Sequence, residues 1–137
     1  MGLIYENITL KNSFDVTNHK RGIINESEIR QIKVLAMVDT GSEMLVINDA
    51  MRQELGLEVD GEQPIRLAND FTQVCKYTEP VRVHWKDRST VTTAVVLDGA
   101  DEVLLGAIPL EGMNVMVDSA SQQLVGVYGD QIMYKIK

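Results

Sequence analysis

One aspartate, Asp39, is placed where a carboxylate could take part in catalysis. It follows an apolar run, residues 34–38, of β-branched and aliphatic side chains. Such a run is typical of a buried strand. Gly41 marks a turn directly after it, and Thr40 and Ser42 add hydroxyl groups on either side of that glycine. Because an aspartate after a strand is most often a turn former or a helix cap, Asp-Thr-Gly alone does not indicate catalysis.

Further segments, in a specific order, strengthen the catalytic interpretation. A second apolar run follows the turn at residues 45–47, and Leu-Leu-Gly stands downstream at residues 104–106. Together with the Asp-Thr-Gly-Ser turn, these segments resemble the retropepsin-like aspartic proteases, the single-lobed relatives of pepsin. More narrowly, the chain is similar to the small cellular members found in bacteria. The resemblance covers nearly the whole chain and includes residues 55–57, 67–70 and 102–111.

The chemistry of this family needs two carboxylates. Without a metal or a covalent nucleophile, peptide hydrolysis needs a base that deprotonates water and an acid that protonates the carbonyl oxygen. Two carboxylates about 3 Å apart supply both, because like charges so close cannot both ionise. Since Asp39 is the one credible aspartate, the second carboxylate would come from a two-fold related copy. The resemblance therefore implies a homodimeric aspartic endopeptidase that acts on a peptide or protein substrate.

An alternative from a different class is a non-catalytic dimeric module that binds peptides or mediates interactions and retains the protease fold. The intact Asp39, Thr40, Gly41 and Gly106 favour the enzyme.

The resemblance also implies roles for the neighbours of Asp39. Thr40 would form hydrogen bonds across the two-fold axis, Gly41 would let its amide approach the carboxylates, and Ser42 would donate to the outer oxygen of Asp39. The implied substrate-binding positions are Ala68, Asn69, Asp70 and Phe71 at the tip of a flap hairpin, and Gly106 beneath the catalytic loop. The flap has Asn-Asp where many relatives have a glycine, so its mobility is not defined by the resemblance.

A second segment repeats the catalytic pattern imperfectly. Residues 116–121, Met-Val-Asp-Ser-Ala-Ser, resemble residues 37–42. The repeat lacks the glycine that allows a tight turn beneath a substrate. The chain is also too short for the two lobes of a pepsin-like enzyme. We therefore expect Asp118 not to be catalytic.

Other catalytic and metal sites lack the residues they need. The chain has two histidines, His19 and His84, and one cysteine, Cys75, so no Ser-His-Asp order and no Cys/His cluster is present. We expect no metal and no cofactor. Cys75 has no evident activating partner and is expected to pack within a strand. A single cysteine excludes an internal disulfide and fits a reducing compartment.

Charge and hydropathy predict the surroundings of the protein. With 20 acidic and 13 basic residues, the net charge of −7 argues against a nucleic-acid partner. No apolar stretch approaches membrane-spanning length, so no membrane partner is expected. The N-terminus lacks the basic region and long apolar core of a signal peptide. These features predict a cytoplasmic protein.

The sequence predicts one domain, residues 1–137, with an all-β fold: a single-lobed, retropepsin-like closed barrel with one short helix. That helix covers residues 49–55, between a capping Asn48 and a terminating Gly56. The resemblance implies a further short helix at residues 108–111. Polar composition predicts loops at residues 12–22 and 58–63. The expected strands cover residues 3–10, 29–38, 44–47, 65–67, 81–83, 91–97, 103–105, 115–117, 124–127 and 132–137, with a hairpin tip at residues 68–71.

Overall fold

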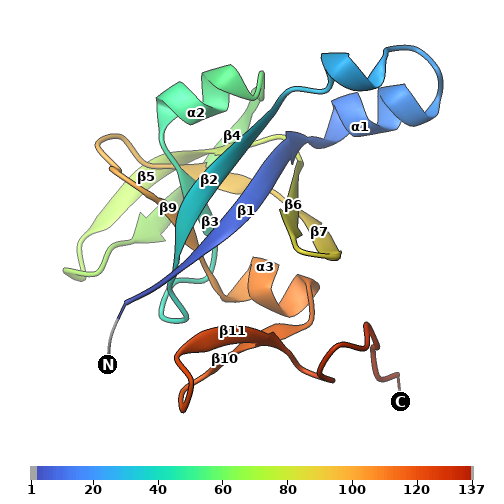
Figure 1. The fold of residues 1–137 in the computed structure, drawn as a ribbon. Helices are drawn as coiled ribbons and strands as arrows, with labels where there is room; N and C mark the ends of the chain where they lie inside the picture. Colours follow the sequence, from blue (N-terminus) through green and yellow to red (C-terminus); the bar gives the residue numbers. More distant parts are fainter. Residues whose placement is uncertain (1–2, 137) are drawn as a thin grey trace.

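A computed structural model describes residues 3–136 and shows a chain built mainly from strands (Figure 1). The strands are β1 (Ile4–Asn12), β2 (Gln31–Val38), β3 (Leu45–Ile47), β4 (Val59–Arg66), β5 (Thr72–Thr78), β6 (Val81–Trp85), β7 (Arg88–Thr92), β8 (Ala94–Val96), β9 (Val103–Leu105), β10 (Val115–Asp118) and β11 (Gln123–Gly126). The helices are α1 (Ser13–Lys20), α2 (Asp49–Glu54) and α3 (Ala107–Gly112), with a 3-10 turn, η1 (Glu26–Glu28).

Nine of these strands form one sheet in the order β4-β5-β8-β3-β9-β2-β1-β6-β7, and β10 and β11 form a separate hairpin. The mostly-β character is therefore confirmed. Within the described residues, β4 and β7 stand at opposite ends of the sheet and do not pair with each other, so the closed barrel is not confirmed. The sheet is mixed, because β2 runs parallel to β9 and β3 runs parallel to β8. Parallel pairs join strands far apart in sequence, which local patterns do not reveal.

The prediction of one short helix was wrong, because residues 3–136 contain three α-helices. Helix α2 lies where it was expected: the Asn48 side chain accepts a hydrogen bond from the Met51 amide at 2.9 Å, and Gly56 follows with a φ of +64°. Helix α3 covers the segment that the resemblance indicated. Helix α1 replaces the loop predicted at residues 12–22.

Helix α1 was missed because contacts outside its own sequence define it. Its N-terminus is capped by Asn12, whose side chain accepts a hydrogen bond from the Asp15 amide at 3.1 Å. The carboxylate of Asp15 in turn accepts three hydrogen bonds from Arg30, at 2.8 Å from Nε, 2.9 Å from Nη2 and 3.0 Å from the backbone amide. These bonds lower the pKa of Asp15 below its usual value. A long-range ion pair therefore completes a helix that has no clear apolar stripe.

Three other local predictions were wrong. The acidic loop predicted at residues 58–63 belongs largely to β4, which pairs with β5. The single strand predicted at residues 91–97 is interrupted at Thr93, where the Ala94 amide donates to Thr78 Oγ1 at 3.1 Å. Residues 132–136 form no strand, and Lys137 lies outside the described residues. The hairpin predicted at residues 115–127 is present. The hairpin tip predicted at residues 68–71 is present too, but its second strand is β5, which was not predicted, and not the strand at residues 81–83.

The main core lies on one face of the sheet and supports the ends of the central strands, and a smaller buried cluster of Val46, Cys75 and Val95 lies on β3, β5 and β8. Buried apolar side chains come from every part of the sheet; the fully buried ones include Leu10, Leu45, Ile47, Val81, Val83, Val103 and Leu105. Strands β2, β3 and β9 therefore end against a close-packed interior, which limits movement of the loops that follow them. No helix in the described part of the chain is long and apolar enough to cross a membrane.

Candidate active site

Asp39 is the first residue after β2, and its backbone is held on two sides. Its amide donates to the Leu105 carbonyl at 3.0 Å, which extends the pairing of β2 with β9. Its carbonyl accepts from the Ser42 amide at 3.1 Å, which closes the turn. The apolar run therefore ends in a turn whose position is set by a neighbouring strand.

Gly41 brings a backbone donor to the Asp39 carboxylate. Its amide lies 3.0 Å from Oδ1 of Asp39. A β-carbon at Gly41 would lie 3.3 Å from the same oxygen, closer than most real contacts. The glycine therefore permits a backbone hydrogen bond that holds the carboxylate in this orientation.

The other two residues of the predicted catalytic loop make different contacts. Thr40 is exposed, and in the single chain it makes no side-chain hydrogen bond within the described part. The Ser42 hydroxyl likewise makes no hydrogen bond to Asp39 among the described residues, so the bond that the resemblance implied is not formed here. Instead the Ser42 carbonyl accepts from the Ala107 amide at 2.8 Å.

Gly106 is the point where the loop contacts the rest of the fold. A β-carbon on Gly106 would overlap the Met44 carbonyl oxygen and lie 2.7 Å from that of Ser42. Directly after it, the first amides of α3 donate to the loop: Ile108 to the Glu43 carbonyl and Ala107 to that of Ser42, each at 2.8 Å. Only glycine allows the strand end and the loop to approach so closely.

The Asp39 loop and the hairpin of β4 and β5 line one groove of about 880 Å³. Asp39, Gly41 and Ser42 contribute from one side, and Ala68 and Asp70 from the hairpin tip. The predicted site residues Thr40, Asn69, Phe71 and Gly106 are not part of this lining. The sequence did not identify most of the remaining lining residues, which are Glu43, Met44, Val46, Gln63, Pro64, Ile65, Arg66, Leu67, Val95, Leu97 and Leu104.

The missed apolar residues come from β3, β4, β8 and β9 or their ends. Each is one member of an ordinary strand pattern, so nothing in the sequence separates a groove residue from a core residue.

The hairpin tip is a closed and well-defined turn. The Asp70 amide donates to the Leu67 carbonyl at 3.0 Å, and the Leu67 amide donates to the Phe71 carbonyl at 2.8 Å. The Asn69 side chain accepts from the Phe71 amide at 3.1 Å. Asp70 has a φ of +67°, a left-handed conformation that glycine usually occupies and that aspartate tolerates. Asn-Asp therefore builds the turn that a glycine would otherwise allow.

The repeated segment around Asp118 has the contacts of a hairpin turn. The Asp118 carboxylate accepts from the Ala120 amide at 3.1 Å and from the Ser121 hydroxyl at 3.0 Å. It lies at the end of β10 and is not part of the groove lining. These bonds satisfy the carboxylate within its own turn, as expected for an aspartate that terminates a strand.

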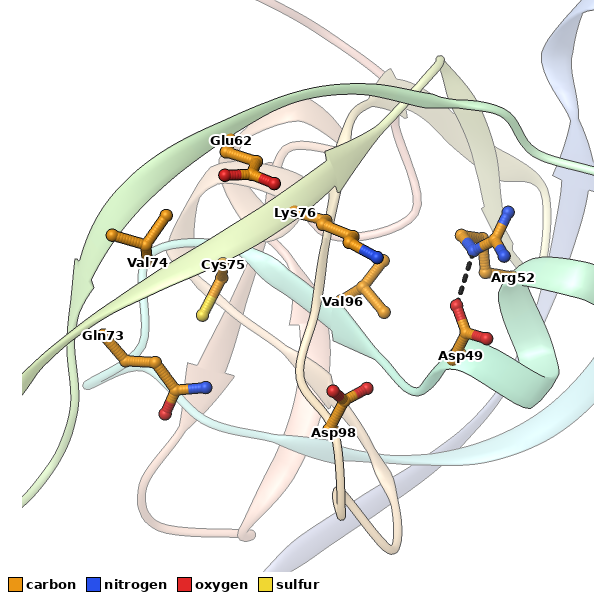
Figure 2. A pocket seen from close by; sticks show the side chains of 9 residues that line it. All are labelled: Asp49, Arg52, Glu62, Gln73, Val74, Cys75, Lys76, Val96 and Asp98. Carbon is orange, nitrogen blue, oxygen red and sulfur yellow. Dashed lines mark hydrogen bonds and ion pairs between the residues drawn. The ribbon is translucent and has the colours of Figure 1, made fainter.

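A second, smaller pocket of about 410 Å³ contains the cysteine (Figure 2). Figure 2 shows Cys75 among charged side chains, with Asp49 and Arg52 joined by an ion pair of 2.7 Å. Burial raises the pKa of the Cys75 thiol, and the charge of Asp98 raises it further. The thiol is therefore protonated near neutral pH and is a poor nucleophile. No group of three or more His, Cys, Asp or Glu side chains in residues 3–136 is arranged to hold a metal ion.

Comparison with known proteins identifies the groove-forming region with one family. A family profile described as gag-polyprotein putative aspartyl protease matches residues 25–112, more than half of the chain, including the Asp39 turn, the hairpin tip and Gly106. Among solved structures, the chain is similar to a retropepsin-like aspartic protease from Rickettsia conorii, with 18% sequence identity and a TM-score of 0.47. That match covers 87% of this chain and 90% of the other. No curated protein matches the chain.

Proposed function

Because this chain belongs to the retropepsin-like aspartic proteases, in the family of gag-polyprotein putative aspartyl proteases, we propose that it is an aspartic endopeptidase that works as a homodimer. The observation that carries the proposal is the groove in which the Asp39 turn faces the hairpin tip. A substrate backbone bound there would lie between a carboxylate and a flap, with apolar side chains around it.

Each protomer contributes one Asp39 to the proposed catalytic pair. One carboxylate is ionised and takes a proton from a water molecule held between the two, while the water oxygen attacks the carbonyl carbon of the substrate. The other, protonated carboxyl group donates its proton to the carbonyl oxygen, which gives a tetrahedral diol. Collapse of the diol breaks the C–N bond as a proton passes to the leaving nitrogen. The apparent pKa values belong to the pair and not to either chain.

The second carboxylate must come from outside the chain described. Two other acidic residues, Glu43 and Asp70, line the same groove. Neither forms a hydrogen bond with Asp39 among the described residues, where the Oδ1 partner is the Gly41 amide. A proton-sharing pair needs two carboxylates about 3 Å apart. A two-fold copy that places a second Asp39 beside the first meets this need.

A cleavage assay tests the proposed reaction. An unfolded protein is incubated with the enzyme across a pH series, with and without pepstatin, and the products are analysed by mass spectrometry. Peptide bonds cut in the interior of the chain, with inhibition by pepstatin, support the proposal. The absence of cleavage at every pH, together with saturable binding of the unfolded chain, would instead favour a non-catalytic peptide-binding module.

Dilution tests the homodimer. Because a monomer holds half of the catalytic pair, specific activity should fall once the concentration drops below the dimer dissociation constant, by about tenfold for each further tenfold dilution. Size-exclusion chromatography with light scattering, run at the same concentrations, gives the fraction of dimer. Constant specific activity at concentrations where the protein is monomeric would contradict the shared site.

A further inference from the structure

The face of the sheet opposite the core carries an unusual distribution of charge on four neighbouring strands. Strands β2, β1, β6 and β7 follow one another in the sheet (Figure 1). Residues alternate between the two faces of a strand, and the burial pattern identifies the outward positions. They are Gln31, Lys33, Leu35 and Met37 in β2, Tyr5, Asn7, Thr9 and Lys11 in β1, Arg82 and His84 in β6, and Ser89 and Val91 in β7.

This outward face contains three cationic side chains and an imidazole but no carboxylate. In a chain of 137 residues with 20 acidic and 13 basic side chains, an even distribution over these twelve positions would place about two acidic and one basic side chain there. The strand register brings the basic groups together: Lys11 is paired with Arg82, and Thr9 with both Lys33 and His84. Arg82 and His84 are two residues apart on one strand and therefore lie side by side. The face is a local source of positive potential on an acidic protein.

Two nitrogen atoms at the centre of this face lack hydrogen-bond partners. Nε of Arg82 and Nε2 of His84 are shielded from water, and neither makes a hydrogen bond in the described structure. A buried polar atom without a partner is unfavourable, and native proteins rarely leave one without a reason. An acceptor placed between Arg82 and His84 would satisfy both atoms, with His84 protonated on Nε2.

We propose that Lys11, Arg82 and His84 form a binding site for a tetrahedral dianion of the phosphate class. The planar fork of Arg82 suits two oxygen atoms of such a group, and Lys11 adds a mobile charge. Lys33, Thr9 and Ser89 lie in the same cross-strand row as His84, next to the row that contains Lys11 and Arg82. They add one further charge and two hydroxyl groups. The anion gains access when the long side chains of Lys11 and Arg82 rotate outward. None of these residues lines the Asp39 groove, so the site does not depend on the proposed proteolysis.

The protonation of His84 gives the site a distinctive pH dependence. Burial lowers the pKa of His84, and the charges of Lys11 and Arg82 lower it further. The other outward groups next to it, Thr9 and Ser89, carry no charge. A bound dianion raises the pKa of His84, so binding takes up a proton. Affinity should therefore rise as the pH falls from the pKa of His84 in the bound form to its pKa in the unbound form, and should be level above and below this range.

Sulfate is a suitable probe because it remains a dianion over this pH range. The chain has two histidines, so the imidazole NMR signals of His84 and His19 can be assigned with a His19→Asn variant. Sodium sulfate is titrated against sodium chloride of equal ionic strength. We expect a saturable shift of the His84 NMR signal and a raised pKa of His84. The NMR signal of His19 should not shift. Equal, non-saturating changes at both histidines would show salt screening only and would overturn the site.

Variants test the residues of the site. Arg82→Gln should weaken sulfate binding at least tenfold and Lys33→Gln severalfold, whereas Lys76→Gln on β5 removes the same charge elsewhere and should change nothing. If Arg82→Gln does not fold by circular dichroism, Lys11→Gln takes its place. Equal affinity in the site variants and the control would contradict the assignment, as would acetate binding as tightly as sulfate. Comparing inorganic phosphate with a phosphoserine peptide distinguishes a free anion from a phosphorylated partner.

Discussion

Replacement of Asp39 by asparagine is expected to abolish proteolysis. Asparagine keeps the size of the side chain and can still accept the hydrogen bond from the Gly41 amide at Oδ1. It can neither take a proton from water nor donate one to the carbonyl oxygen, so both halves of the proposed pair are lost. Removal of a group at the reacting centre commonly lowers kcat by a factor of about 10⁴ or more. The measurement is kcat/KM on a fluorogenic peptide identified from the cleavage products.

The matched control for this prediction is Asp118→Asn. Asp118 stands in the repeated segment and is bonded within its own hairpin turn. Its replacement should leave kcat/KM nearly unchanged and lower stability slightly. Circular dichroism and light scattering should show that both variants retain fold and assembly. Full activity in Asp39→Asn would contradict the assignment of Asp39, and loss of activity only in Asp118→Asn would indicate a catalytic role for the repeated segment.

A mixing experiment extends the same prediction to the shared site. Wild-type and Asp39→Asn chains are mixed in different ratios at constant total protein concentration, and subunits are allowed to exchange. Mixed dimers hold one aspartate and one asparagine, so activity should fall as the square of the wild-type fraction. A decrease in simple proportion to that fraction would indicate that each chain is complete by itself.

Gly106→Ala is expected to have the second largest effect. The added carbon overlaps the carbonyl oxygen of Met44 and crowds that of Ser42, both backbone atoms of the loop that carries Asp39. The loop must shift, because backbone atoms cannot rotate away as a flexible side chain can. Overpacking of this kind costs about 1–3 kcal/mol of unfolding free energy. A displacement of about 1 Å at a catalytic group lowers activity roughly 10²-fold.

Urea unfolding and kcat/KM together test the effect of Gly106→Ala. The control is Gly99→Ala, where the added carbon meets no atom within 4 Å but the φ of +81° disfavours alanine. That variant should lose stability through backbone strain alone and keep its kcat/KM. If Gly106→Ala loses no more activity than Gly99→Ala, the contact at Gly106 has no role in positioning the loop.

The sequence by itself determined the features that depend on a few neighbouring residues. The apolar run before Asp39 predicted β2, since β-branched and aliphatic residues favour a buried strand. Asn48 and Gly56 predicted both ends of α2, because a side-chain cap and a left-handed glycine act within one turn of the helix. The hairpin at residues 115–127 and the hairpin tip at residues 68–71 followed from turn residues. The Asp-Thr-Gly-Ser turn also indicated the family, which the family profile confirms.

Tertiary structure alone decided the features that depend on contacts between distant segments. Helix α1 requires the ion pair of Asp15 with Arg30, and the open, mixed sheet depends on parallel pairing between strands far apart in the chain. The groove exists because β9 holds the Asp39 turn in place while the hairpin tip stands across from it. The need for glycine at position 106 arises where a strand end meets the Ser42 and Met44 carbonyls. Local propensity cannot report such contacts, because their free energy comes from groups that only the folded chain brings together.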